Sequence, residues 1–161
     1  MTTSPSSIFM LAALVAALML GATGARADER YTPVTDAVTK KECGACHMAF
    51  QPSMLPAKSW TRIMDGLTDH FGEDASLDAA TVNHIKSYLV GNAADAGWWG
   101  GKFMRGLGDD AAPLRITETP YWLREHNKEV PASAWRDPRV KSKANCIACH
   151  RAAEKGYYDD D

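Results

Sequence analysis

The four cysteines of the chain fall into two Cys-x-x-Cys pairs, and a histidine follows each pair directly. The first motif occupies residues 43–47 and the second occupies residues 146–150. Two thiols three positions apart lie on one side of a helical turn, where they can add to the two vinyl groups along one edge of a porphyrin. The next residue then places an imidazole beneath the iron as its proximal ligand. This spacing is typical of covalent c-type haem attachment.

The two motifs therefore predict two covalently attached haem c groups, and they use every cysteine in the chain. The predicted attachment residues are Cys43, Cys46, Cys146 and Cys149, and the predicted proximal iron ligands are His47 and His150.

Three other chemistries also use Cys-x-x-Cys pairs. A four-cysteine zinc ribbon spaces its two pairs by about 15–20 residues, whereas a hundred positions separate Cys46 from Cys146. Zinc also gives no reason for a histidine after both pairs. A disulfide framework suits an exported protein, and a thioredoxin-like redox motif needs a βαβ context that the sequence lacks. Haem attachment accounts for the cysteines and the histidines together.

The sixth iron ligand decides what chemistry each haem can perform. A methionine raises the reduction potential, a second histidine lowers it, and an open position would bind small gases or peroxide. The remaining candidates are His70, His84, His126 and Met104. Periodicity places His70 and His84 at similar flanks of two expected helices, so it does not separate them. Met104 lies in a Gly-rich loop, much as small His/Met cytochromes place their sulfur ligand.

The elements that position these residues are expected to be short helices, because no stretch alternates apolar and polar residues strictly. The expected helices begin at Thr32-Pro33, Pro56, Ser76, Thr119-Pro120 and Asp137-Pro138. The first and the last should run into the two Cys motifs. The second should end at Gly72, the third at Gly91 and the fourth at His126. The fold class is therefore predicted to be all-α.

Residues 92–116 are rich in Gly and Ala and are expected to form a loop with one short helical turn. This loop would join two haem-binding halves, residues 28–92 and 93–161. The chain has 161 residues, 45% of them hydrophobic and 24% charged, with a formal net charge of −2. That balance gives no basic field for nucleic acid and no signature of a disordered chain.

The N-terminus has the pattern of a leader. An unbroken apolar run over residues 8–20 precedes the small-x-small site Ala25-Arg26-Ala27. This pattern predicts a secretory signal peptide over residues 1–27, with an uncleaved anchor as the alternative. The run is shorter than the about 20 apolar residues of a bilayer span, and no later stretch is apolar enough to cross a membrane.

Stretches around the motifs resemble the small periplasmic dihaem cytochromes c of bacteria. They are CGACHMAFQPSMLPAKSWTRIMDGLTDHFGEDASLD at 43–78, RITETPYWLREH at 115–126 and NCIACHRAAEKGYYDD at 145–160. The resemblance implies a small cytochrome c-like helical protein with two haems, each held by two histidines. It implies that His70 and His126 are the distal ligands, and it ranks His84 and Met104 below them.

The resemblance also implies an electron carrier rather than an enzyme. A membrane b-type cytochrome would supply electrons, and a monohaem c-type cytochrome would accept them, in the periplasm. The competing class is a haem enzyme, or a sensor of gases or peroxide, with one open or Met-ligated haem. Basic residues near the motifs could pair with haem propionates or remain solvated: Lys41, Arg115, Lys143 and Arg151.

Overall fold

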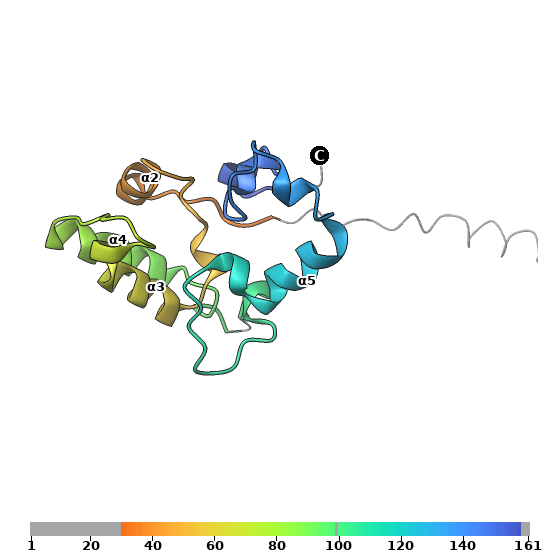
Figure 1. Cartoon of the computed structure of the whole chain (residues 1–161). Coiled ribbons are helices and arrows are strands. Elements are labelled where there is room, and N and C mark those ends of the chain that lie inside the picture. Colours follow the sequence, from red (N-terminus) through yellow and green to blue (C-terminus); the bar gives the residue numbers. More distant parts are fainter. Residues whose placement is uncertain (1–29, 99, 159–161) are drawn as a thin grey trace, which may run out of the picture.

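The computed structural model describes residues 30–98 and 100–158 (Figure 1). The predicted signal peptide lies outside these described residues. Within them the chain forms helices and contains no β-strand, only two isolated β-bridges. The all-α prediction is therefore confirmed. Over the same ranges, no helix is long and apolar enough to cross a bilayer.

The α-helices are α2 (Ala37–Cys43), α3 (Ala57–Asp65), α4 (Ala79–Gly91) and α5 (Pro120–Glu129). Short 3-10 turns connect them: η1 (Pro52–Met54), η2 (Leu67–Asp69), η3 (Lys102–Met104), η4 (Ile116–Glu118), η5 (Ala134–Arg136), η6 (Cys146–Ala148) and η7 (Ala153–Lys155). α4 packs against both α3 and α2, and α5 packs against η3 and η4. Figure 1 shows α2, α3 and α4 at one end of the molecule and α5 at the other.

Each helix start depends on which side chain accepts hydrogen bonds from the free backbone N–H groups of the first turn. α5 begins as predicted, because the Thr119 hydroxyl accepts a hydrogen bond from Trp122 N at 3.3 Å and Pro120 takes the first helical position. α4 begins later than predicted, since the Asp78 carboxylate, rather than Ser76, accepts from Thr81 N at 3.0 Å. α4 ends at Gly91, as the sequence predicts, whereas α5 continues past His126 to Glu129.

The predicted starts of the first and last expected helices are wrong. Residues 31–36 are not helical, and α2 begins only after Asp36, whose carboxylate accepts from Thr39 N at 2.7 Å. Asp137-Pro138 opens no helix. The Asp137 carboxylate instead accepts hydrogen bonds from the backbone and the guanidinium of Arg139, and Lys141 adopts a φ of 61°. A right-handed helix cannot contain that conformation, so the second Cys motif lies in the short turn η6.

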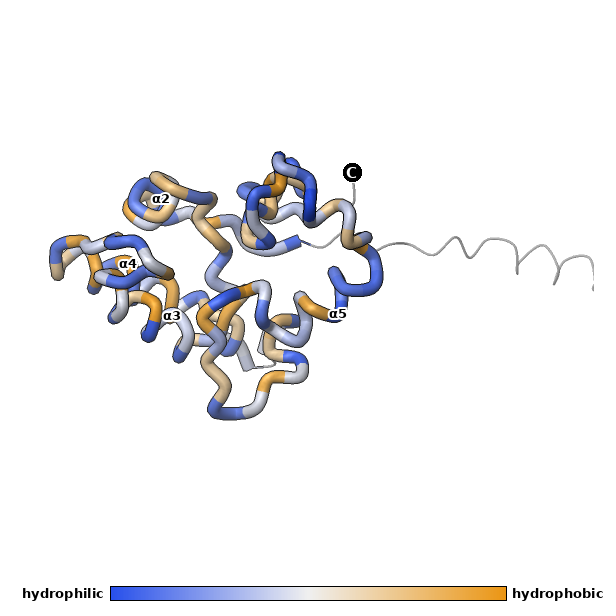
Figure 2. The backbone as a smooth tube through the Cα atoms, viewed as in Figure 1, coloured by the Kyte–Doolittle hydropathy of each residue, from blue (hydrophilic) through white to orange (hydrophobic). Residues whose placement is uncertain are grey.

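One apolar cluster joins α3, α4 and α5. Its buried members are Met54, Leu55, Trp60, Met64, Ile85, Leu89, Ala93, Ala94, Phe103, Ile116, Tyr121 and Trp122. They come from the Gly- and Ala-rich stretch itself and from the segments on both sides of it. η3 is the short turn expected within that stretch. Each large side chain buried here contributes about 1.5–3 kcal/mol. Figure 2 shows hydrophobic and hydrophilic residues interspersed along α3 and α4, as expected for helices with one buried face.

The first described residues pair with the last. Tyr31 N donates to Gly156 O at 2.8 Å, and Arg30 and Tyr157 form an isolated antiparallel bridge. Gly156 has a φ of 83°, and a Cβ at this position would overlap the carbonyl of Tyr31. Only glycine allows this close approach of the two segments.

Candidate functional site

The first Cys motif begins at the end of α2. Cys43 is the last helical residue, and Gly44 N donates to Lys40 O at 3.0 Å to cap the helix. A Cβ at Gly44 would overlap the carbonyl oxygen of Lys40. Glycine therefore lets the chain turn directly after Cys43, which leaves Cys46 and His47 exposed beside it.

The His47 ring is oriented by its neighbours. Its Nδ1 donates to the carbonyl of Met48 at 2.7 Å, since a carbonyl oxygen can only accept. In a neutral imidazole this leaves the lone pair on Nε2, the nitrogen available to a metal. The ring also stacks on Phe50, with centroids 5.0 Å apart.

His70 lies opposite His47. Their ring centroids are 6.1 Å apart and their planes differ by 20°. α3 ends at Asp65, well before the Gly72 that the sequence predicts, so His70 is presented by a turn rather than by a helix. His70 and Glu73 exchange two backbone hydrogen bonds, of 2.8 and 3.3 Å, around Phe71 and Gly72, which both have positive φ. This is the pattern of a type I′ turn.

Burial is the main factor that lowers the pKa of His70, and the nearby His47 and Arg115 lower it further. The neutral imidazole that can donate its lone pair to a metal is therefore favoured at this position. The Arg115 guanidinium also lies over the Phe71 ring, 3.9 Å from its centroid, which fixes the turn against η4.

The second Cys motif is held by local turns. Asn145 Nδ2 donates to Val140 O at 3.0 Å, which closes the loop before the motif. His150 N donates to Cys146 O at 2.8 Å, which folds the motif into one turn. Burial raises the pKa of the Cys146 thiol to about 11 and raises the pKa of Cys43 as well. None of the four cysteines forms a disulfide.

His126 lies opposite His150, with ring centroids 6.2 Å apart and planes at 82°. It extends from α5, where its Nδ1 donates to Trp122 O at 2.9 Å. The Trp122 ring stacks on it at 4.1 Å with an interplanar angle of 10°. As at His47, the Nδ1 hydrogen bond leaves the lone pair of the neutral ring on Nε2.

The two centroid distances match the spacing that one metal imposes on two imidazoles. A metal–imidazole nitrogen bond is about 2.0–2.1 Å long, so rings on opposite sides of one ion have centroids about 6 Å apart. Each pair also includes the histidine of a Cys-x-x-Cys-His motif. The donor set thus fits two haem groups, each with two thiols and two imidazoles. In the described residues, no three His, Cys, Asp or Glu side chains converge as a separate metal site.

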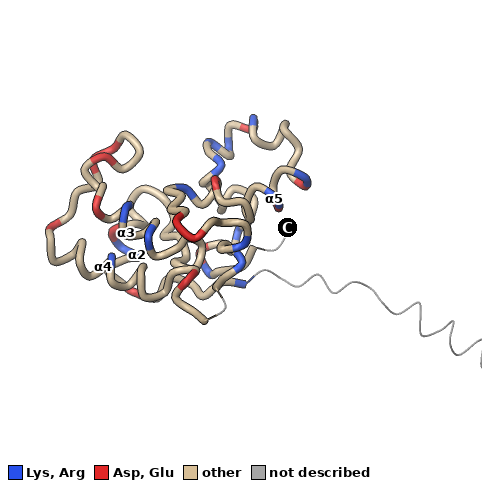
Figure 3. The backbone as a smooth tube through the Cα atoms, turned by 90° about the horizontal axis from the view of Figure 1, so that it is seen from below, with Lys and Arg blue, Asp and Glu red and all other residues tan. Residues whose placement is uncertain are grey.

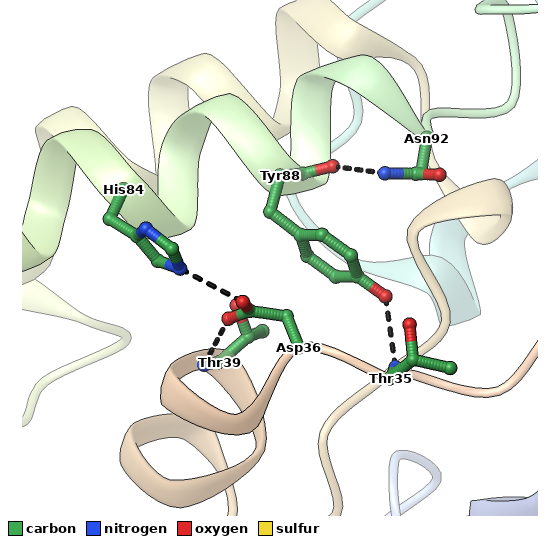
Figure 4. A network of polar contacts seen from close by, with 6 residues as sticks. All are labelled: Thr35, Asp36, Thr39, His84, Tyr88 and Asn92. Atoms are coloured by element: carbon green, nitrogen blue, oxygen red, sulfur yellow. Dashed lines mark hydrogen bonds and ion pairs between the residues drawn. The ribbon is translucent and has the colours of Figure 1, made fainter.

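The other two ligand candidates have contacts elsewhere. His84 Nε2 is 2.9 Å from Asp36 Oδ2, so α4 is tied to the start of α2 (Figure 4). The hydrogen bond from Thr39 N is the main factor that holds the pKa of Asp36 at about 2. Met104 lies in η3 and packs against the apolar cluster beside Gly100. The structure thus brings His70 and His126 to the two motif histidines, and gives His84 and Met104 other partners.

A family profile described as dihaem cytochrome c matches residues 39–158. The chain belongs to the dihaem cytochrome c family. Its fold is similar to that of a diheme cytochrome c from Rhodobacter sphaeroides, with a TM-score of 0.75 and 48% identity over 79% of this chain and 99% of that one. It is also similar to a diheme cytochrome c from Shewanella baltica, with a TM-score of 0.62 and 35% identity over 76% and 86% of the two chains. No curated protein matches.

Sequence reasoning missed a pair of residues that links the two motifs. Gln51, four residues after His47, is fully buried. Its Nε2 donates to Ala153 O at 2.7 Å, and its Oε1 accepts from the Tyr158 hydroxyl at 2.6 Å. The Tyr158 ring packs against His150 at 5.3 Å. No spacing pattern could have identified this contact, because its partners are 107 positions apart.

Proposed function

We propose that the protein is an exported electron carrier whose two covalently bound haems are each ligated by two histidines. In this assignment, His47 and His70 would hold the iron of the haem attached to Cys43 and Cys46. His126 and His150 are the ligands of the haem attached to the second motif. Membership of the dihaem cytochrome c family supports the two haems and the carrier role.

The centroid spacings of 6.1 and 6.2 Å carry the ligand assignment. They favour His70 and His126 over His84 and Met104, which lie in contacts of their own. When bound, haem supplies one-electron iron chemistry. Two imidazoles at each iron would leave no coordination site for a substrate, which favours electron transfer over catalysis at the iron.

The chain's own contribution is to fix the ligands and to place apolar rings beside them. The Nδ1 hydrogen bonds of His47 and His126 set which nitrogen faces the iron and how the rings stand. Stacked aromatic rings, Phe50 beside His47 and Trp122 beside His126, provide apolar cover at each pair. Burial, axial ligands and hydrogen bonds together tune the reduction potentials.

The cellular setting follows from the resemblance and the leader. Cleavage after Ala27 would release the protein into the periplasm. There it would take electrons from a membrane b-type cytochrome and pass them to a monohaem c-type cytochrome.

Optical spectra of the purified holoprotein test the ligand assignment. We expect a low-spin ferric spectrum without a sulfur-to-iron band, and no rapid binding of CO by the reduced protein. A haem stain after denaturing electrophoresis should show covalent attachment. A high-spin ferric signal or fast CO binding would instead support the enzyme or sensor alternative.

Four variants assign the distal ligands. His70→Ala and His126→Ala should each convert one haem to a high-spin, CO-binding form. His84→Ala and Met104→Leu are matched controls, and both should retain the low-spin spectrum. If His84→Ala or Met104→Leu opens a haem instead, the proposed ligand set is wrong.

A further inference from the structure

Two segments of the sequence, one at each histidine pair, carry opposite formal charge. Residues 63–85, which include His70, contain five carboxylates and no Lys or Arg. Residues 136–155, which include the second Cys motif, contain six Lys and Arg against two carboxylates. In Figure 3, Lys and Arg predominate on the arm that projects near α5, and Asp and Glu on the arm near α3.

The positive residues of the second segment form a surface that we call the basic collar. Its members are Arg136, Arg139, Lys141, Lys143, Arg151 and Lys155, all of them exposed. One of the two carboxylates, Asp137, pairs with Arg139 at 2.6 Å, so the charges of these two residues offset each other. The turns η6 and η7 fold this segment locally, and the collar residues flank the second motif on both sides in the sequence.

The surface inside the collar is partly apolar. Ile147, within the second motif, is 44% exposed, and Cys149 beside it is exposed as well. An apolar centre with a charged rim is the usual anatomy of a docking surface. Charge at such a rim steers the approach of a partner more than it adds to affinity.

We propose that the basic collar docks the acidic surface of a protein redox partner beside the second haem. This inference rests on the proposed function, because it requires a haem at the second motif. The acidic segment around His70 would repel the same partner from the first haem. Opposite charges at the two haems thus separate the docking sites of two partners.

A stopped-flow assay with oxidised plastocyanin, an acidic copper protein, tests the proposal. One electron passes from the reduced holoprotein to Cu(II), which becomes Cu(I), and no bond or proton is exchanged. We expect the double variant Lys141→Glu/Lys155→Glu to lower the second-order rate constant about tenfold at low ionic strength. The loss should vanish at about 1 M salt, where the Debye length is about 3 Å.

The matched control is Lys40→Glu/Arg105→Glu, which changes the net charge equally but lies outside the collar. It should lower the rate constant less than about twofold. If the rate constant fell equally in both variants, the proposal would be overturned, because the rate would then depend only on net charge. An unchanged rate in the collar variant, with a shifted potential of one haem, would also overturn it and would assign these residues to the propionates.

The optical spectra of the same samples show whether a result contradicts the docking proposal or the proposed function. Low-spin spectra without CO binding in all variants would leave the carrier role intact whatever the rates show. A high-spin or CO-binding wild-type protein would contradict the proposed function itself.

Discussion

The two histidine pairs differ in how their rings face each other. The planes of His47 and His70 are 20° apart, whereas those of His126 and His150 are 82° apart. Parallel axial imidazoles split the iron d orbitals that hold the unpaired electron of a low-spin ferric haem. Perpendicular imidazoles leave these orbitals nearly equal in energy. The two haems should therefore be magnetically distinct.

Electron paramagnetic resonance of the frozen ferric holoprotein measures this difference. We expect one rhombic low-spin signal from the first haem and one highly anisotropic low-spin signal from the second. His70→Ala should remove the first signal, and His126→Ala should remove the second. Two identical rhombic signals would contradict the ring orientations.

The sequence predicted the two motif histidines and, through the resemblance, two distal histidines, but not which distal histidine faces which motif or how the rings are oriented. Cys-x-x-Cys-His fixes the proximal histidine by its spacing, and the resemblance selects His70 and His126. The ring planes depend on hydrogen bonds to backbone carbonyls, such as that from His126 to Trp122, which no sequence pattern encodes.

At the scale of elements, α2 depends on Asp36. This carboxylate caps the helix that ends at Cys43 and also pairs with His84 of α4 (Figure 4). The pKa of Asp36 is about 2, below the ordinary value of 3.8. A lowered pKa in the folded state means that the charged carboxylate stabilises the fold above pH 3.8, and that this contribution is lost as the pH falls towards 2.

Asp36→Asn tests that dependence, because asparagine keeps the helix cap but removes the charge. We expect the variant to be less stable than the wild type at about pH 6, with a difference that shrinks by about pH 3. Urea unfolding at both pH values measures the free energies. A difference that is independent of pH would contradict a role for the charge.

Helix starts show where sequence reasoning succeeds and where it does not. Both Thr-Pro pairs have the residue types of a helix start, yet only Thr119-Pro120 forms one. Just before Thr32-Pro33, Tyr31 pairs with Gly156, and this contact holds the chain extended so that residues 31–36 stay out of a helix. A contact with a distant part of the chain thus overrides the preference of the Thr-Pro pair for a helix start.

At the scale of the whole molecule, Gly156 determines whether the first and last described segments can meet. Gly156→Ala would place a Cβ against the Tyr31 carbonyl and would strain a φ of 83°. We expect a loss of about 1–3 kcal/mol in the free energy of unfolding, measured by denaturant titration. Gly108→Ala, where no atom lies within 4 Å of the new Cβ, should change it by less than about 0.5 kcal/mol.

The buried contact between Gln51 and Tyr158 joins the regions that carry the two haem motifs. Burial raises the pKa of the Tyr158 phenol, so the hydroxyl remains protonated and donates to Gln51. Gln51→Leu would leave both Ala153 O and the Tyr158 hydroxyl without their present partner. An unsatisfied buried polar group costs about 1–3 kcal/mol, so this variant should lose at least that much stability.

Because Tyr158 packs against His150, the same variant should alter the highly anisotropic resonance of the second haem while leaving the rhombic signal of the first. Tyr158→Phe should reproduce part of both effects. The double variant should lose less stability than the sum of the losses of the two single variants, because the two residues share one hydrogen bond. Tyr157→Phe, which removes a hydroxyl from the exposed neighbouring ring, is the matched control. Additive losses, or an unchanged second resonance, would show that the contact does not position His150.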